Sequence, residues 1–483
     1  MINFSRINGL LSFWLFLIFA LGITFGFRFP HPLLFIIFSL VSLVLIYFFY
    51  KRKNFFCSDI CILLLFFFLG GLWVIPQAKR SQAIDTCLSL DGVFTLKTVS
   101  LPQERSTRNT FYAVVQPFNK KVYVMDYTRN LEYLYSYKVM GKLSRRNYQG
   151  RDFYTFWVKK GAEIEELPSP FWNRYTRKTI AYLLGVFESN LKPQGYRFLA
   201  SILLGRREVL ADEKQILTNA GAAHLLALSG LHLGFISLML FFILRLFYLS
   251  FRTSLVISVL FLLVYTFLTG MAWSTLRAAL MYFFFAAGFF LKRRVNLLNS
   301  LGLAGLCTLI VNPSALFEVG FQLSYLAVFA LIVWFKIFPV KVFANRLLNY
   351  LQGLFFCSFS VTLFLTPLIS YYFGRIYFLS VFYNLILIPF FALLLTIGFL
   401  LIVFSALGFI AQSIGSILSL GISWFVSLTG ALGSFGLSYF EYRFSSYMVG
   451  MYYFLLVVGL ISIPRLASRR SRGDLFKDKF RKG

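Results

Sequence analysis

The stretch "PLLFIIFSLVSLVLIYFFYKRK", residues 32–53, decides the class of fold. Residues 32–50 are apolar or aromatic except for two serines. A run of this length can cross the hydrocarbon core of a bilayer as a helix. The basic residues at 51–53 are typical of the cytoplasmic end of such a span. The stretch therefore predicts a transmembrane helix that ends inside the cell.

Similar apolar runs recur along the chain. Of its 483 residues, 59% are hydrophobic and 13% are charged, a balance that a soluble domain cannot bury. The sequence therefore predicts a polytopic α-helical membrane protein with about twelve transmembrane helices. We expect these spans near residues 9–27, 32–50, 57–75, 223–247, 253–270, 273–291, 296–311, 317–338, 350–372, 378–404, 407–432 and 446–464.

The distribution of Lys and Arg predicts the orientation of the spans. The chain has 47 Lys and Arg against 18 Asp and Glu, and most of the excess is explained by basic loops held in the cytoplasm. If both termini are cytoplasmic, the basic loops alternate correctly with loops poor in Lys and Arg. The basic ones lie at 51–53, 250–252, 292–294, 336–346 and from Arg465 onward; the others are "FPHP", "TGMAW", "VNPSA" and "EYRFSS".

This alternation places residues 78–170 outside the cytoplasm. They contain five short runs rich in Val, Tyr, Phe and Thr, separated by polar breaks, which predict a small extracytoplasmic β domain that is OB-like. The expected organisation is N-terminal transmembrane helices at 1–77, the β domain at 78–170, amphipathic or interfacial helices at 171–220, a transmembrane channel domain at 221–464 and a basic cytoplasmic tail at 465–483.

Several kinds of chemistry lack their motifs. The chain has three histidines and no zinc-hydrolase spacing among them, and it has no P-loop. We therefore expect no metal, no cofactor and no catalytic residue, and we do not expect an enzyme.

The segment "GAAHLLALSGLHLG", residues 221–234, is unusually polar for its surroundings. It holds His224, Ser229 and His232, and the small-xxx-small pair Gly230 and Gly234 lets another helix approach or lets this one break. Both rings could simply hydrogen-bond neighbouring helices. A Ser229–His232 dyad of an intramembrane serine hydrolase is disfavoured, because the preceding glycine of a G-x-S-G motif and a third orienting group are missing.

Other polar residues lie where the bilayer makes them costly. Arg277 begins a span, and Asn384 lies ahead of Pro389. Glu318, Gln322 and Ser324 are close enough in sequence to predict a polar stripe on one helix. Several such residues together indicate that the bundle encloses something wet or charged.

Four blocks in this order resemble the ComEC-type competence family, the inner-membrane channels for DNA uptake in natural transformation. They are "HLLALSGLHLG", "TLRAALM", "NPSALFEVGFQLSYLAV" and "TPLISYYFGRIYFLSVFYNLILIP", and they span about residues 220–390. The resemblance implies a channel-lining or motif role for His224, Ser229, Gly230, His232, Gly234, Arg277, Glu318, Gln322, Ser324 and Asn384. Family members often have Asp where this chain has Glu318. Many also continue into a metallo-β-lactamase-like domain, which we expect to be absent here.

The resemblance implies import of single-stranded DNA through a multi-pass protein of the bacterial inner membrane. Implied partners are single-stranded DNA, the lipid bilayer, a separate cytoplasmic ATP-driven translocase and a separate DNA receptor or nuclease; a homo-oligomer is compatible with the sequence. A transporter or flippase for another anionic polymer or lipid-linked precursor is the alternative. Basic and aromatic residues around one turn of the β domain are candidates to contact the strand, and a solvated basic hairpin is the alternative: Lys142, Arg145, Arg146, Tyr148, Arg151 and Phe153.

Overall fold

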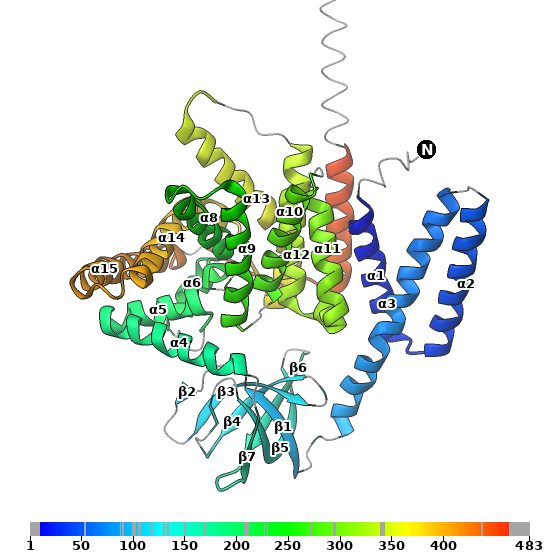
Figure 1. Cartoon of the computed structure of the whole chain (residues 1–483), viewed down its shortest axis with the longest axis horizontal. Helices are drawn as coiled ribbons and strands as arrows, with labels where there is room; N and C mark the ends of the chain where they lie inside the picture. Colours follow the sequence, from blue (N-terminus) through cyan, green and yellow to red (C-terminus); the bar gives the residue numbers. More distant parts are fainter. Residues whose placement is uncertain are drawn as a thin grey trace, which may run out of the picture. The chain divides into compact units, whose positions relative to one another are not determined.

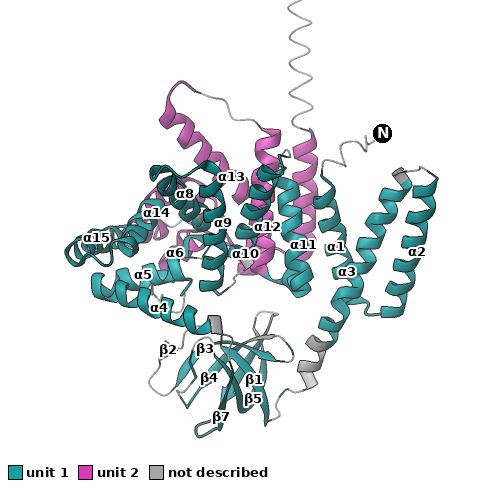
Figure 2. Cartoon of the chain, viewed as in Figure 1, with its two compact units in different colours: residues 1–215, 224–318, 391–426 teal, residues 216–223, 319–390, 427–483 magenta. Residues whose placement is uncertain are grey.

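The chain forms two compact units in the computed structural model (Figure 2). Unit 1 comprises residues 1–215, 224–318 and 391–426, and unit 2 comprises residues 216–223, 319–390 and 427–483. The structure describes residues 10–462 with gaps at 53–54, 87, 89–90, 99–102, 105–107, 117, 119, 129–130, 133–134, 149–150, 169–170, 207–211, 227, 229, 271–272, 293–295, 339–342 and 436–437. The basic tail from Arg465 lies outside the described residues.

Eight helices in the described part of the chain are long and apolar enough to cross a membrane. They are α1 (Leu11–Arg28), α2 (Pro32–Lys51), α3 (Phe55–Thr86), α9 (Phe251–Leu268), α12 (Val319–Ile337), α13 (Arg346–Phe373), α14 (Ser380–Val403) and α15 (Gly408–Gly433). Shorter apolar helices are α8 (Gly230–Leu246), α10 (Trp273–Phe290), α11 (Leu297–Val311) and a helix at Ser446–Ser462. The chain is therefore a polytopic membrane protein, as the sequence predicts. That all of these helices span the membrane stays a prediction.

The first three helices pack side by side in unit 1 (Figure 1). Gly22 and Gly26 of α1 lie directly against the backbone of Phe67 and Gly71 in α3. A Cβ at either position of α1 would overlap carbonyl oxygens of α3, so the close approach requires glycine. In a bilayer such contacts replace the hydrophobic effect as the force that joins helices.

The segment after α3 in unit 1 folds as a sheet of seven strands. They are β1 (Asp91–Thr98), β2 (Gln103–Glu104), β3 (Asn109–Gln116), β4 (Lys120–Asp126), β5 (Ser136–Tyr148), β6 (Arg151–Val158) and β7 (Ile164–Leu167). The main strands follow the order β1-β3-β4-β6-β5, and β5 also pairs with β1, so these five strands close into a barrel. β4 and β6 are parallel, and the other pairs of the barrel are antiparallel.

Side chains along each strand alternate between the inside and the outside of the barrel, which explains its apolar interior. Inward positions carry fully buried apolar residues such as Phe111, Val124, Leu143 and Phe156. At one end the carboxylate of Asp126 accepts hydrogen bonds from the backbone N–H groups of Thr128 and Leu131, 2.9 and 3.2 Å long, and fixes the loop that follows β4.

Three helices follow the barrel in unit 1: α4 (Phe171–Asn190), α5 (Pro193–Leu204) and α6 (Asp212–Asn219), of which only the first residues of α6 belong to this unit. α4 is two-sided, with Ile180 and Phe187 buried and Tyr175 and Tyr182 exposed. The guanidinium of Arg177 lies 3.5 Å from the ring centre of Tyr135 and attaches α4 to a loop of the barrel.

Unit 2 is built around α13. Its core includes Ala330 of α12 together with Phe364 and Leu365 of α13. The hydroxyls of Tyr452 and Tyr453, on the helix at Ser446–Ser462, donate hydrogen bonds of 2.8 and 3.0 Å to carbonyl oxygens of α13. α13 ends at Gly374 in the left-handed conformation (φ 70°), and the short strand β8 (Arg375–Ile376) then pairs with β9 (Phe440–Glu441).

Candidate functional site

The segment that the sequence singles out is not one continuous helix. α7 (Ala223–Leu226) ends before α8 begins at Gly230, and Ala227 and Ser229 lie outside the described residues. The single span expected at 223–247 is therefore interrupted. Glycine and a polar hydroxyl lower helix propensity here, which explains why the break falls at this point.

The chain between α7 and α8 contacts α10, the helix that carries the second motif block. The hydroxyl of Ser274 donates a 2.7 Å hydrogen bond to the carbonyl of Leu228, so backbone freed by the break finds a partner. A Cβ at Gly230 would lie 3.1 Å from an Nη atom of Arg277, whereas a Cβ at Gly234 would meet nothing within 4 Å. The structure thus brings the first two motif blocks together at Gly230 and Arg277.

The two histidines of the segment have opposite environments. His224 is exposed, whereas His232 is completely buried. The ring of His232 meets Phe391 of α14 edge-on, with centroids 4.8 Å apart and planes at 80°. Phe391 also contacts Phe425 of α15, which contacts Phe198 of α5. His232 therefore begins an aromatic row that joins four helices of unit 1.

Charged side chains are also buried in unit 1. Arg277 is 4% exposed, and Arg206 and Glu213 are each 3% exposed. A charge taken out of water is costly unless partners compensate it, so such residues mark functional sites in membrane proteins by default. Sequence reasoning selected Arg277 and missed Arg206 and Glu213, because it treated residues 171–220 as interfacial.

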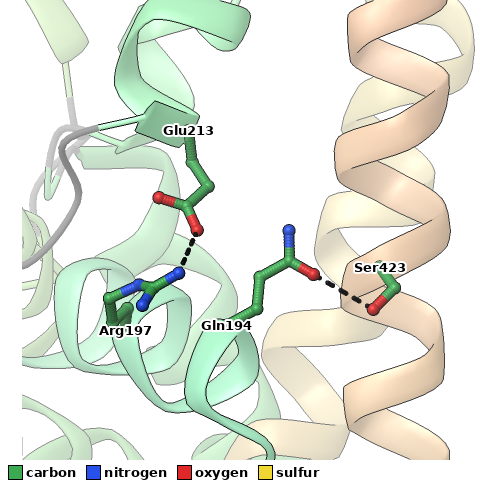
Figure 3. A network of polar contacts seen from close by, with 4 residues as sticks. All are labelled: Gln194, Arg197, Glu213 and Ser423. Carbon is green, nitrogen blue, oxygen red and sulfur yellow. Dashed lines mark hydrogen bonds and ion pairs between the residues drawn. The ribbon is translucent and has the colours of Figure 1, made fainter.

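A polar network links α5, α6 and α15 in unit 1 (Figure 3). Arg197 donates a 3.1 Å hydrogen bond to the buried carboxylate of Glu213, and the hydroxyl of Ser423 donates one of 3.1 Å to Gln194. The hydroxyl of Ser419 accepts a bond of 3.2 Å from the backbone N–H of Lys192. The four-residue spacing of the two serines could have indicated this polar face of α15 from the sequence.

The third and fourth blocks meet in unit 2. The hydroxyl of Tyr372 donates a 2.8 Å hydrogen bond to the side-chain oxygen of Gln322. Ser324 is half-buried and Asn384 on α14 is 8% exposed. Glu318 belongs to unit 1, where it is exposed and lies just before α12 begins at Val319, so the stripe expected on one helix lacks its first member.

The turn expected to contact DNA is the hairpin between β5 and β6. Arg146 pairs with Phe153, and Tyr148 pairs with Arg151 across it. Lys142, Arg145 and Phe153 are exposed, whereas the side chains of Arg146, Tyr148 and Arg151 lie outside the described residues.

The outer surface of the barrel carries aromatic side chains that sequence reasoning missed. The rings of Tyr127 and Trp157 stack with planes at 11° and centroids 6.4 Å apart, and Arg108 lies over Tyr127. Tyr112 and Tyr123 form a cross-strand pair beside them. Lys142 pairs with Trp157 in the strand register, so basic and aromatic side chains share this surface.

Apolar helices with buried charges, combined with a β barrel between the third and fourth helices, define a class: multi-pass membrane proteins with an inserted polar domain. The family model described as Competence protein matches residues 202–466, more than half of the chain. The chain belongs to this family.

Two curated relatives agree with the family match. ComE operon protein 3 of Bacillus subtilis (strain 168) is 27% identical over 77% of this chain and 48% of its own length. Recombination protein 2 of Haemophilus influenzae (strain ATCC 51907 / DSM 11121 / KW20 / Rd) is 28% identical over 44% of this chain and 29% of its own length. The chain thus matches about half of the first relative and less than a third of the second. No solved structure matches the chain.

Proposed function

We propose that this protein is a channel that imports single-stranded DNA across the bacterial inner membrane during natural transformation, and that it is not itself an enzyme. The observation that carries the proposal is the interrupted helix at Leu226–Gly230, beside the buried Arg277 and His232 and inside the family-matched region. Broken helices and buried ionisable groups are found in membranes where they border a polar path. The family description, Competence protein, and the name of one relative, Recombination protein 2, support a DNA substrate.

The proposed topology has twelve spans and two cytoplasmic termini. It divides the chain at the boundaries expected from the sequence, with the β domain at 78–170 outside the cytoplasm. A single cysteine at exposed Lys142, placed in a chain freed of its native cysteines, should react with an impermeant maleimide added to intact cells. Protection of that cysteine, together with outside labelling of the tail, would refute this orientation.

We further propose that the barrel is of the OB type. Counting its five main strands in chain order, they close as 1-2-3-5-4-1, and the second and third strands carry Tyr112 and Tyr123. OB barrels bind oligonucleotides on this pair of strands and its flanking loops. Stacking on aromatic rings with nearby cations tolerates any base sequence, so we expect weak and unselective binding of unpaired strands.

Import needs an energy source supplied by a partner. Each phosphate carries one negative charge, and moving a charge against the membrane potential costs about 2.3 kcal/mol per 100 mV. We therefore propose a separate cytoplasmic ATP-driven translocase, with the basic tail as its dock or as an anchor beside anionic lipid. A separate receptor or nuclease supplies the single strand, and a homo-oligomer is compatible with this arrangement.

Binding of single-stranded DNA by the full chain in lipid nanodiscs tests the proposed function. Affinity for a labelled oligothymidylate should fall steeply as salt rises, because phosphate binding releases counterions. A salt-independent or absent interaction would refute the DNA channel and favour the transporter of another polymer. Sustained uptake into liposomes by this protein alone, against an inside-negative potential, would refute the need for a translocase.

A further inference from the structure

In unit 2 a pair of short strands connects residues far apart in the sequence. β8 and β9 are antiparallel, with Arg375 opposite Glu441 and Ile376 opposite Phe440. The pair follows the left-handed turn at Gly374, whose carbonyl accepts a 3.0 Å hydrogen bond from the backbone N–H of Tyr442. Backbone hydrogen bonds before and after Arg375 in the chain therefore hold its backbone in place.

The side chain of Arg375 is largely enclosed. Its guanidinium donates hydrogen bonds to the side-chain oxygen of Asn219 at 3.3 Å and to a carboxylate oxygen of Glu441 at 3.5 Å. The guanidinium carbon also lies 4.3 Å from the ring centre of Tyr439. The exposed fractions differ greatly, at 21% for the Arg375 side chain and 70% for that of Glu441.

Arg375 also has a side-chain hydrogen bond with Tyr377, whereas its bonds to Asn219 and Glu441 are long for a guanidinium donor. Charge-assisted N–H···O bonds are usually about 2.7–2.9 Å long, and an ion pair with one exposed carboxylate contributes about 1 kcal/mol at most. The cation–π contact with Tyr439 positions the guanidinium, whose planar fork suits an anion. A phosphate oxygen could therefore replace Glu441 at little cost in free energy.

Two exposed aromatic side chains lie close to Arg375 and Glu441 in sequence. Phe378 and Phe440 are 59% and 48% exposed, and their rings meet edge-on with centroids 6.1 Å apart. Phe440 is next to Glu441 in β9, and Phe378 is three residues after Arg375. Because consecutive residues of a strand point to opposite faces, these rings lie on the other face of the strand pair from Arg375 and Glu441, and the anion contact rests on Arg375 itself.

We propose that Arg375 is a phosphodiester-binding residue for an unpaired nucleic-acid strand. In the free protein the carboxylate of Glu441 occupies the place of the phosphate. This inference rests on the proposed function, and the proposed topology puts the Glu441 loop outside the cytoplasm. An arriving phosphate displaces the carboxylate and takes its contact with the guanidinium.

The test uses the full chain in nanodiscs and a labelled oligothymidylate. Glu441→Gln keeps the shape of the side chain and removes the competing charge, so affinity should rise about twofold to fivefold at low salt, the range for loss of one exposed ion pair. Arg375→Lys keeps the charge and loses the fork, so affinity should fall about fivefold or more. The exposed Glu188 on α4 gives the matched control, because Glu188→Gln makes the same charge change elsewhere.

The double variant Arg375→Lys with Glu441→Gln should bind no more tightly than Arg375→Lys alone, because the carboxylate acts through Arg375. An equal gain in affinity from Glu441→Gln in both backgrounds, or from Glu188→Gln, overturns the inference. A wild-type chain that binds while Glu441→Gln changes nothing overturns it and leaves the proposed function standing. Failure of wild-type binding overturns both. If the variants differ from the wild type only in nanodiscs of anionic lipid, and do so without oligonucleotide, Arg375 binds a lipid headgroup instead.

Discussion

The imidazole of His232 meets the ring of Phe391 edge-on, with 4.8 Å between their centroids. The contact joins the first motif block to α14 and places a titratable group in a completely buried aromatic row. A purely structural role would be filled equally well by another aromatic ring.

Replacement of His232 by Phe separates these roles. The Phe ring keeps the packing on Phe391 and removes both ring nitrogens, so we expect normal folding with DNA uptake reduced about tenfold or more. His232→Ala should also lose about 3 kcal/mol of stability, because it leaves a cavity. Thermal unfolding in detergent and uptake of labelled strands measure the two effects. Full uptake by His232→Phe would assign the residue to packing alone.

Gly230 and Gly234 provide a matched pair on one helix. A Cβ at Gly230 would lie 3.1 Å from Arg277, which must then move, whereas a Cβ at Gly234 meets open space. We expect Gly230→Ala to reduce uptake severalfold. Gly234→Ala should leave uptake unchanged and stabilise α8 by up to about 1 kcal/mol. Equal uptake by the two variants would show that the approach of Arg277 to the helix start is unimportant.

Ser229 distinguishes a channel from a hydrolase. Ser229→Ala should retain most DNA uptake, because a polar lining loses one hydroxyl among several, and a fluorophosphonate should not label the wild-type chain. Ser274→Ala serves as the comparison, since it removes a hydroxyl that bonds the neighbouring Leu228 carbonyl. Labelling of the wild-type chain that disappears in Ser229→Ala would establish a nucleophile and refute the channel reading of this residue.

The buried phenol of Tyr137 should make the barrel less stable at alkaline pH. Burial raises the pKa of its phenol to about 12, against about 10 in an unfolded chain. The folded barrel thus holds the proton more tightly, so this contribution is complete below about pH 10 and is lost as pH rises towards about 12.

Urea unfolding followed by tryptophan fluorescence measures this loss. Tyr137→Phe should weaken the barrel by about 1 kcal/mol at neutral pH, because the Glu132 N–H loses its acceptor. The variant should then show a flatter decline above pH 10, whereas replacement of the exposed Tyr112 by Phe should keep the wild-type slope. If the free energy of unfolding falls equally with pH in the wild type and in both variants, Tyr137 is not the cause of the alkaline loss of stability.

Local patterns in the sequence predicted most of the elements. The apolar runs coincide with helices, and the five runs rich in Val, Tyr and Phe coincide with β1, β3, β4, β5 and β6. Period and composition decide these elements within a few residues, so a single sequence is sufficient to find them.

Long-range pairings could not be predicted in the same way. The closure of β1 on β5, the stack of Tyr127 on Trp157 and the ion pair of Arg197 with Glu213 each depend on register or on helix packing. The break before Gly230 was signalled by its glycine, whereas the hydrogen bond of Ser274 to the carbonyl of Leu228 depends on helix packing. The roles expected for Asn384, Gln322 and Ser324 stay predictions.

The closure of β1 on β5 has a consequence for how the protein is made. Asp91 pairs with Lys142, so the first strand has no second neighbour until about fifty further residues of the chain have been synthesised. Until then it exposes an unpaired edge, which is prone to aggregate. Synthesis must therefore reach β5 before the first strand is covered on both sides, and a ribosome stalled between the two strands should leave a nascent chain that is sensitive to added protease.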